Sequence, residues 1–340
     1  MILTRGVPRW NIGYPGKIAK WLAALLIVSS AIANAQTCQT AGDMDPATAS
    51  ALSATAKRLY DMAARGDSAA LRQSAMPSLA SNFSGIESAV KDNQPSLTGV
   101  QAVPRPPFLL KAEGTAPLQR AEFLCGIFGA QGQTRDSAVF VIPNLPPGNY
   151  GIVTLDAASP QGAYTVSFVL QQQGNDWKLG GFYAKPAQIS GHDGNWFASR
   201  AREFKTKGQL HNAWFYFGEA RELLVPVPFM ATAATDRLYD EMQAQKPADL
   251  PPFDLMAGGK TYKVTDLFPI PVGHDFDLVV RYQSADVSDT GKTFQDNTAV
   301  MKALVTKYPE LRDAFAGIVA RAVEPSGRDY GSMLGMKDIK

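Results

Sequence analysis

The side chains that most often carry chemistry are scarce in this chain, which has three histidines and two cysteines among its 340 residues. His192, His211 and His274 lie far apart, and only His274, beside Asp275 and Asp277, has acidic neighbours that could complete a metal or acid–base group. The alternative is that these three residues simply open a strand. Neither a Gly-x-Ser-x-Gly elbow nor a His-Glu-x-x-His motif occurs. We therefore predict no metal site and no cofactor, and we favour a protein that is not an enzyme.

Two short stretches resemble ligand-binding loops, but each lacks a required residue. Residues 258–261, Gly-Gly-Lys-Thr, end like a phosphate-binding loop, yet Asp254 stands where the leading glycine belongs. A second stretch has the spaced oxygen ligands of a calcium loop, yet Asn297 stands where a bidentate glutamate is needed. This stretch consists of Asp286, Ser288, Thr290 and Gly291. The sequence predicts neither a nucleotide site nor a dedicated calcium site.

The amino terminus has the pattern of a secretory signal peptide. Residues 1–35 contain basic residues ahead of an apolar run at 21–33, and they contain no acidic residue. The run is short for a membrane span, and Ala33-Asn34-Ala35 offers the small residues that a signal peptidase requires. We predict cleavage before Gln36, a periplasmic or extracellular location, and no transmembrane segment in the mature chain. The alternative is an uncleaved amino-terminal anchor.

Both cysteines follow this cleavage site, in a chain predicted to reach an oxidising compartment. Cys38 and Cys125 are therefore expected to form a disulfide, which would tie the amino terminus to a strand. The alternative is a buried Cys125 and an unpaired Cys38. Cys125 has no second Cys or His nearby in the sequence, so it is a poor candidate nucleophile.

The charge balance limits the classes of partner. The formal net charge of +2 includes the basic leader, so the mature chain is close to neutral and has no Lys/Arg-rich run. This argues against nucleic acid and against an anionic membrane surface held by charge.

The first domain, predicted at 36–190, reads as helices followed by a sheet. One apolar helix face runs from Pro46 to Gly66, Asp67 caps a second helix, and the proline-rich residues 94–107 read as an extended linker. Strands follow at short intervals, which implies an antiparallel sheet completed by the hairpin 164–186. These strands are expected at 108–112, 121–128, 137–142 and 150–156.

This order of elements, the 65–67 junction Arg-Gly-Asp and the 177–182 strand Trp-Lys-Leu-Gly-Gly-Phe resemble the nuclear transport factor 2-like superfamily. The resemblance covers roughly 45–186 and implies helices in the mouth of a curled, cone-like sheet. The cone would serve as an enzyme pocket, a ligand pocket or a dimer surface. Its polar residues would be Glu122, Asp136, Asp156 and Tyr183, of which Asp136, Glu122 and Tyr183 are the catalytic candidates.

Residues 191–246 resemble a single tetratricopeptide-like helical hairpin. The matching positions are Ala201, Phe204, Gly208, Ala213, Phe217 and Ala220. One such unit cannot bury both its faces, so it should contact a neighbouring domain or a partner. Trp214, Phe215, Tyr216 and Phe217 crowd one turn, and the first three are partner-binding candidates. We favour packing of these rings on the sheet of the first domain over an exposed partner-binding surface.

A second linker at 247–252 leads to a small α+β module at 253–340, with strands at 261–265 and 276–283, helices at 298–307 and 311–315, and a final hairpin. The predicted fold class is therefore α+β throughout. The leading functional hypothesis is an exported, non-catalytic protein that binds a small apolar ligand or an envelope protein. The alternatives are a small-molecule enzyme using the cone, and a structural scaffold in an envelope assembly.

Overall fold

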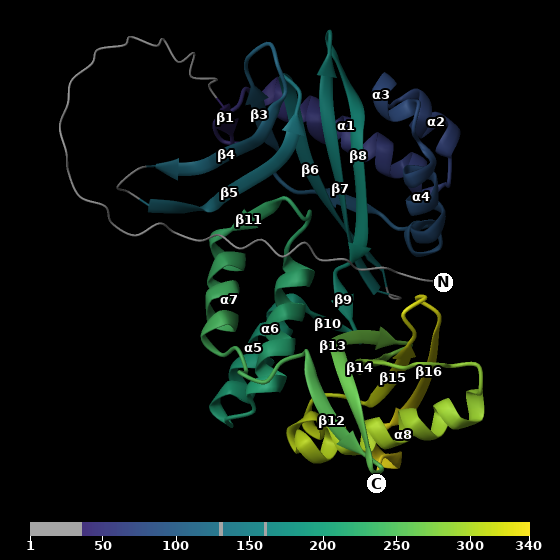
Figure 1. Cartoon of the computed structure of the whole chain (residues 1–340). Helices are drawn as coiled ribbons and strands as arrows, with labels where there is room; N and C mark the ends of the chain where they lie inside the picture. The colour runs from purple at the N-terminus through teal and green to yellow at the C-terminus, as the bar shows by residue number, and fades with distance from the viewer. Residues whose placement is uncertain (1–35, 129–131, 160–161) are drawn as a thin grey trace, which may run out of the picture. The chain divides into compact units, whose positions relative to one another are not determined.

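The computed structural model describes residues 36–128, 132–159 and 162–340, and among these the side chains outside 127–136. The predicted signal peptide and its cleavage site lie outside the described residues, except for Gln36 itself. The helices and antiparallel strands of the described residues confirm the α+β class (Figure 1).

Four helices follow the first strand of the described chain. They are α1 (Pro46–Ala64), α2 (Ser68–Gln73), α3 (Pro77–Ala80) and α4 (Ser84–Leu97). Asp45 caps α1 by accepting from the Thr48 amide at 2.9 Å, and Gly66, at φ +71°, ends it with a left-handed turn. The predicted apolar face of α1 is buried, with Leu52 and Leu59 fully inaccessible.

The interpretation of 94–107 as an extended linker is wrong in its first part. α4 continues through Pro95 to Leu97, although Pro95 has no amide to donate to the preceding turn. Val90 and Leu97 are both buried, so the apolar face bridges the proline. After Thr98 the chain becomes the short strand β2 (Ala102–Pro104).

A six-stranded antiparallel sheet follows, with strand order β1-β3-β6-β7-β8 and β2 beside β6. Its strands are β1 (Gln36–Gln39), β3 (Phe108–Ala112), β6 (Gly148–Ser159), β7 (Gly162–Gln173) and β8 (Asp176–Pro186), together with β2. Side chains alternate between its two faces. Val153 and Phe168 join the core beneath α1–α4, whereas Leu110 and Ile152 join a second core on the opposite face.

The second core is covered by a three-stranded sheet of order β11-β5-β4. Its strands are β4 (Leu118–Phe128), β5 (Gly132–Leu145) and β11 (Met230–Thr232). Phe123 and Phe140 fill this core. The disulfide between Cys38 and Cys125 joins β1 to β4 across it, which confirms the predicted pairing and fits an oxidising compartment.

The predicted hairpin at 164–186 is present as β7 and β8. Trp177, however, is less buried than its size suggests. Leu179 and Phe182 are buried beneath the helices, whereas Trp177 is half-buried at the edge of the same core. Trp177 pairs with Gln172 next to the turn, so the sheet cannot surround the indole.

The helical segment contains α5 (Gly194–Thr206), α6 (Leu210–Leu224) and α7 (Ala233–Ala244), after a two-stranded ribbon of β9 (Gln188–Ile189) and β10 (His192–Asp193). Gly208 makes the turn between α5 and α6 at φ +74°. A side chain at Gly194 would meet Leu224 at 2.6 Å and the Ala220 carbonyl at 2.9 Å, so the glycine allows these two helices to approach.

The carboxy-terminal module is a five-stranded sheet in sequence order, β12 to β16. Its strands are β12 (Phe253–Ala257), β13 (Lys260–Val272), β14 (Asp275–Gln283), β15 (Gly317–Val323) and β16 (Asp329–Gly335). β14 and β15 are parallel, so the chain crosses between them through α8 (Thr290–Lys307) and the 3-10 helix η2 (Pro309–Asp313). A second 3-10 turn, η3 (Met336–Asp338), ends the chain.

Both loop-like motifs have structural roles in this module. Gly258 and Gly259 form the tight turn between β12 and β13, both with positive φ as such a two-residue hairpin requires. Asp289 caps α8 by accepting from the Lys292 amide at 3.0 Å, and Asp286 accepts from the Ser288 amide at 2.8 Å. The cap explains why α8 begins eight residues before the predicted helix.

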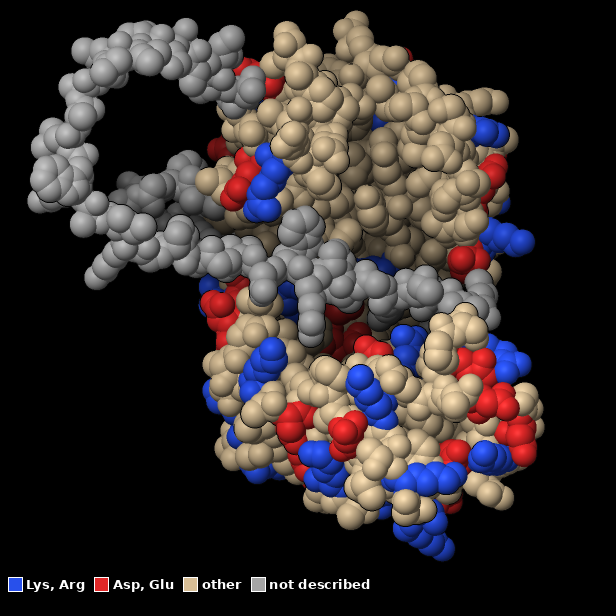
Figure 2. All heavy atoms as spheres, in the orientation of Figure 1, with Lys and Arg blue, Asp and Glu red and all other residues tan. Residues whose placement is uncertain are grey.

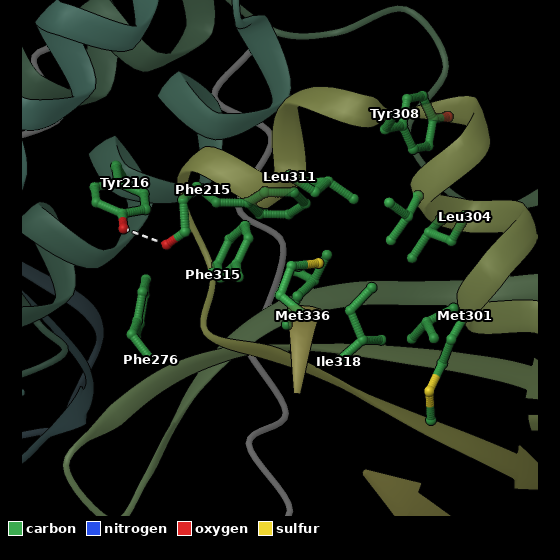
Figure 3. Close-up of a cluster of buried hydrophobic side chains, with 14 of the residues drawn as sticks. Phe215, Tyr216, Phe276, Met301, Leu304, Tyr308, Leu311, Phe315, Ile318 and Met336 are labelled. Atoms are coloured by element: carbon green, nitrogen blue, oxygen red, sulfur yellow. Dashed lines mark hydrogen bonds between the residues drawn. The ribbon is translucent and has the colours of Figure 1, made fainter. Parts of the chain in front are cut away.

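The crowded aromatic residues of α6 pack against the carboxy-terminal module. Figure 3 shows Tyr216 beside Phe276 and Phe315, with ring centroids 5.4 and 6.1 Å from that of Tyr216. Phe215 lies 6.0 Å from Phe315, and all four rings belong to one buried cluster. The interpretation that they pack on the sheet of the first domain is therefore wrong.

Charged side chains are unevenly distributed. On the face shown in Figure 2, acidic and basic residues crowd the surface of the helical segment and the carboxy-terminal module, with the two signs interspersed, whereas the surface of 36–186 is largely uncharged. In the part of the chain that the structure describes, no helix has the length and apolar content to cross a membrane.

Candidate functional site: a cleft between α5, α6 and η2

A cleft of about 290 Å³ opens between three helical elements. α5 supplies four of the lining residues, α6 supplies Tyr216, and the end of η2 supplies Asp313. The lining residues are Trp196, Ser199, Arg200, Glu203, Tyr216 and Asp313. Aromatic surface combined with a few converging polar groups is typical of a binding site.

Trp196 is fixed by the start of α5. Asp193 caps the helix by accepting from the Trp196 amide at 2.8 Å, which sets the first turn. The imidazole of His192 stacks on the indole with a centroid distance of 3.6 Å and an interplanar angle of 8°. Trp196 is nevertheless 37% exposed, a high value for the largest side chain. One face of the ring is thus covered by His192, and Trp196 lines the cleft with part of its surface still exposed.

Tyr216 lines the cleft and is held in place by its surroundings. Its side chain is buried, and its hydroxyl donates a hydrogen bond to the Ala314 carbonyl at 2.5 Å (Figure 3). Burial raises the pKa of Tyr216 to about 12, only partly offset by the charge of Arg200. The phenol is therefore neutral at physiological pH, and its proton is already used in the hydrogen bond to Ala314. Tyr216 thus holds the cleft together and does not act as an acid or base.

The charges of the cleft are unequally compensated. Arg200 Nη1 lies 2.5 Å from Glu203 Oε2, and its guanidinium lies 4.6 Å from the ring centroid of Phe204. Asp313 accepts from the neutral amide of Gln209 at 2.5 Å. The lining thus has two carboxylates and one guanidinium, and the guanidinium already has a carboxylate and an aromatic ring as partners. The formal balance of the lining residues is one negative charge.

A second polar cluster lies where α6 meets the carboxy-terminal module, and it is structural. His211 Nδ1 lies 2.8 Å from Glu310 Oε1, and His211 Nε2 lies 2.9 Å from Asp249 Oδ1. Asp249 Oδ2 also accepts from Lys307 and Tyr308, at 2.9 and 2.8 Å. Desolvation opposes ionisation of Asp249, but the hydrogen bonds from Lys307, Tyr308 and His211 together hold its pKa well below the usual value. Through these hydrogen bonds, Asp249 connects the linker at 247–252 to α6 and to the end of α8.

The histidine group suggested by the sequence is not assembled. His274 and Asp275 are exposed at the turn before β14, whereas Asp277 is fully buried on the strand. Burial, followed by the charge of Asp275, raises the pKa of Asp277. Within the described ranges, no set of three or more His, Cys, Asp or Glu side chains could hold a metal ion.

Of the cone candidates, the structure describes the side chains of Glu122 and Tyr183, and it does not bring these two into one pocket. Glu122 is exposed on β4 and faces Arg120, at 3.8 Å, because its neighbours on the strand point into the core. Tyr183 lies on the other sheet, is 36% exposed, and contacts the ring of Phe229 at 5.6 Å. Asp136 lies in β5, within the stretch whose side chains are not described. The space between α1–α4 and the sheet is occupied by apolar side chains.

Of the three partner-binding candidates, Phe215 and Tyr216 are buried by the carboxy-terminal module. Tyr216 still reaches the cleft. Trp214 is half-buried and has Lys246 Nζ 6.0 Å from its ring centroid. Interior packing therefore accounts for most of this aromatic turn.

Sequence reasoning missed the rest of the cleft. Trp196, Arg200 and Glu203 recur at spacings of four and three, which places them on one face of α5, and this periodicity was a usable signal. Asp313 had no such signal, because it reaches the cleft only through the packing of η2 on α6, about a hundred residues away in sequence.

Comparisons of the chain with known protein families, with curated proteins and with solved structures found no match.

Proposed function

We propose that this protein is an exported, non-catalytic binding protein of the periplasm or cell exterior, and that its binding site is the cleft between α5, α6 and η2. The observation that carries the proposal is Trp196, a stacked and exposed indole that lines a cleft together with the carboxylates of two different helical elements, Glu203 of α5 and Asp313 of η2. Solvent exposure of so large an apolar group is costly unless a ligand or partner covers it.

Two further observations support the proposal. The Cys38–Cys125 disulfide is consistent with export behind a signal peptide at 1–35. The hydroxyl of Tyr216 already donates to the Ala314 carbonyl, and Arg200 already pairs with Glu203, which suits holding a ligand better than transferring its protons.

We also propose that residues 36–190 have a nuclear transport factor 2-like arrangement and that 191–246 is a tetratricopeptide-like hairpin. What supports this is the order of elements, with α1–α4 preceding the sheet and Gly208 turning between α5 and α6. In this arrangement the apolar residues between α1–α4 and the sheet stabilise the first domain, and the ligand binds to the helical segment instead of the cone.

The test is to block the cleft without disturbing the core. Ser199 is exposed and lines the cleft, so Ser199→Trp should fill it, and Gln295→Trp on the exposed side of α8 is the matched control. Both variants and the wild type are used to capture material from the exported fraction of the producing cells, followed by mass spectrometry. Material that binds wild type and Gln295→Trp but not Ser199→Trp supports the proposal. Capture that is unchanged by Ser199→Trp contradicts it.

A further inference from the structure

The cleft has an excess of negative charge beside an aromatic wall. Glu203 is neutralised by Arg200, whereas Asp313 receives only the neutral amide of Gln209. Both carboxylate residues are exposed, so a ligand can reach them without entering the core. Asp313 is thus the charge in the lining that lacks a cationic partner among the cleft residues.

The aromatic wall favours a cation as well. An indole is the best side-chain partner for a cation over its face, and Trp196 is held in place by His192 on one side and by Phe197 at its edge. Tyr216 lies 6.2 Å from Trp196 between centroids, so a second ring borders the same space. Because these rings are already ordered, a bound group would not need to fix them.

Other ligand chemistries fit less well. An anion would have Arg200 as its partner in the lining, and it would have to replace Glu203 while facing Asp313. A purely apolar ligand would desolvate two carboxylates without returning a hydrogen bond to either. The cleft therefore departs from the small apolar ligand expected from the sequence.

Resting on the proposed binding function, we propose that the cleft recognises a guanidinium group, which stacks on Trp196 and donates to the carboxylate of Asp313. A guanidinium is planar, weakly hydrated and rich in donors, so it can use a ring face and a carboxylate at the same time, whereas a compact ammonium can satisfy the carboxylate but stacks poorly. A cleft of about 290 Å³ accommodates one such group together with part of the chain that carries it.

The experiment titrates the full exported protein with three capped amino acids and follows binding by NMR. N-acetyl-arginine amide is the probe, N-acetyl-citrulline amide is its neutral isostere, and N-acetyl-glutamate amide is the anionic control. Loss of a charge-assisted hydrogen bond predicts that citrulline binds at least about tenfold more weakly than arginine. Asp313→Asn should weaken arginine binding by a similar factor, whereas Asp176→Asn, at the exposed turn before Trp177, should leave it unchanged.

The outcomes separate the two proposals. Equal binding of arginine and citrulline, or preferential binding of glutamate, would overturn the guanidinium inference and leave the binding cleft in place. The inference also fails if none of the probes binds while capture by the wild type still depends on an open cleft. Failure of both the probes and the cleft-dependent capture would remove both proposals. Circular dichroism melts of each variant verify that lost binding is not lost folding.

Discussion

The hydroxyl of Tyr216 donates to the main-chain carbonyl of Ala314, the residue that follows Asp313, and this bond joins two parts of the cleft lining. α6 and η2 are far apart in sequence, so the cleft depends on tertiary contacts between them. Further support comes from the buried aromatic cluster around Phe276 and Phe315 and from the hydrogen bond of Gln209 to Asp313.

Tyr216→Phe should therefore destabilise the protein and loosen the cleft together. The ring packing is kept, but the Ala314 carbonyl loses its donor, which costs about 1 to 2 kcal/mol in unfolding free energy. Urea unfolding should give a lower midpoint with an unchanged slope. Tyr239→Phe, on the exposed side of α7, is the matched control and should leave the midpoint unchanged. Equal midpoints for wild type and Tyr216→Phe would show that the bond contributes nothing.

The disulfide should stabilise the amino-terminal part. Cys38 and Cys125 are 87 residues apart, so the bond restricts a long segment of the unfolded chain. Reduction should lower the unfolding free energy by about 2 to 4 kcal/mol. Intact mass should rise by two hydrogens on reduction, and thiol labelling should require prior reduction. Labelling of both cysteines in the untreated protein would contradict the pairing.

The hairpin of β7 and β8 should depend on Phe168 more than on Trp177. Phe168 is fully buried beneath the helices, whereas Trp177 is half-buried. Phe168→Ala should cost about 3 to 5 kcal/mol and Trp177→Ala about 1 to 2 kcal/mol. Chemical denaturation of both variants checks the order. A larger loss for Trp177→Ala would mean that the indole is buried in solution.

Asp249 should make stability depend on pH in the acidic range. Its pKa is lower in the folded protein than in the unfolded chain, so its contribution is complete above the unfolded value of about 4 and is lost as the pH falls toward the folded value. Asp249→Asn should therefore be less stable than wild type at neutral pH, and the difference should shrink on acidification. The exposed carboxylate variant Asp176→Asn should follow the wild-type curve. A difference between Asp249→Asn and wild type that stays constant from pH 7 to pH 2 would contradict this linkage.

Local signals predicted much of the fold. Asp45 and Gly66 mark the ends of α1, and alternation from Tyr164 to Leu170 marks β7, because caps, turns and periodicity act over a few residues. α4 was missed because Pro95 outweighed the apolar face around it. The short strands β1 and β2 were missed because neighbouring strands, not their own residues, make them strands.

The candidate site could be predicted only in part. The spacing of Trp196, Arg200 and Glu203 places these residues on one face of α5, and the crowded rings of 214–217 are a second local feature of the sequence. Those rings proved to be core, since the carboxy-terminal module covers them. No local pattern in the sequence shows which module covers these rings. For the same reason, the sequence does not show that Asp313 lines a cleft together with residues of α5.

The most direct test of the binding cleft uses its own tryptophan. The chain has five tryptophans, of which Trp10 and Trp21 lie in the predicted signal peptide. Labelling the exported protein with 5-fluorotryptophan should therefore give three fluorine resonances, with that of Trp196 assigned by Trp196→Phe. Trp177 and Trp214 lie outside the cleft lining and serve as internal references. On addition of the material captured by the wild type, the resonance of Trp196 should shift while those of Trp177 and Trp214 stay in place. An unmoved Trp196 resonance under conditions where the captured material binds would contradict the proposed site.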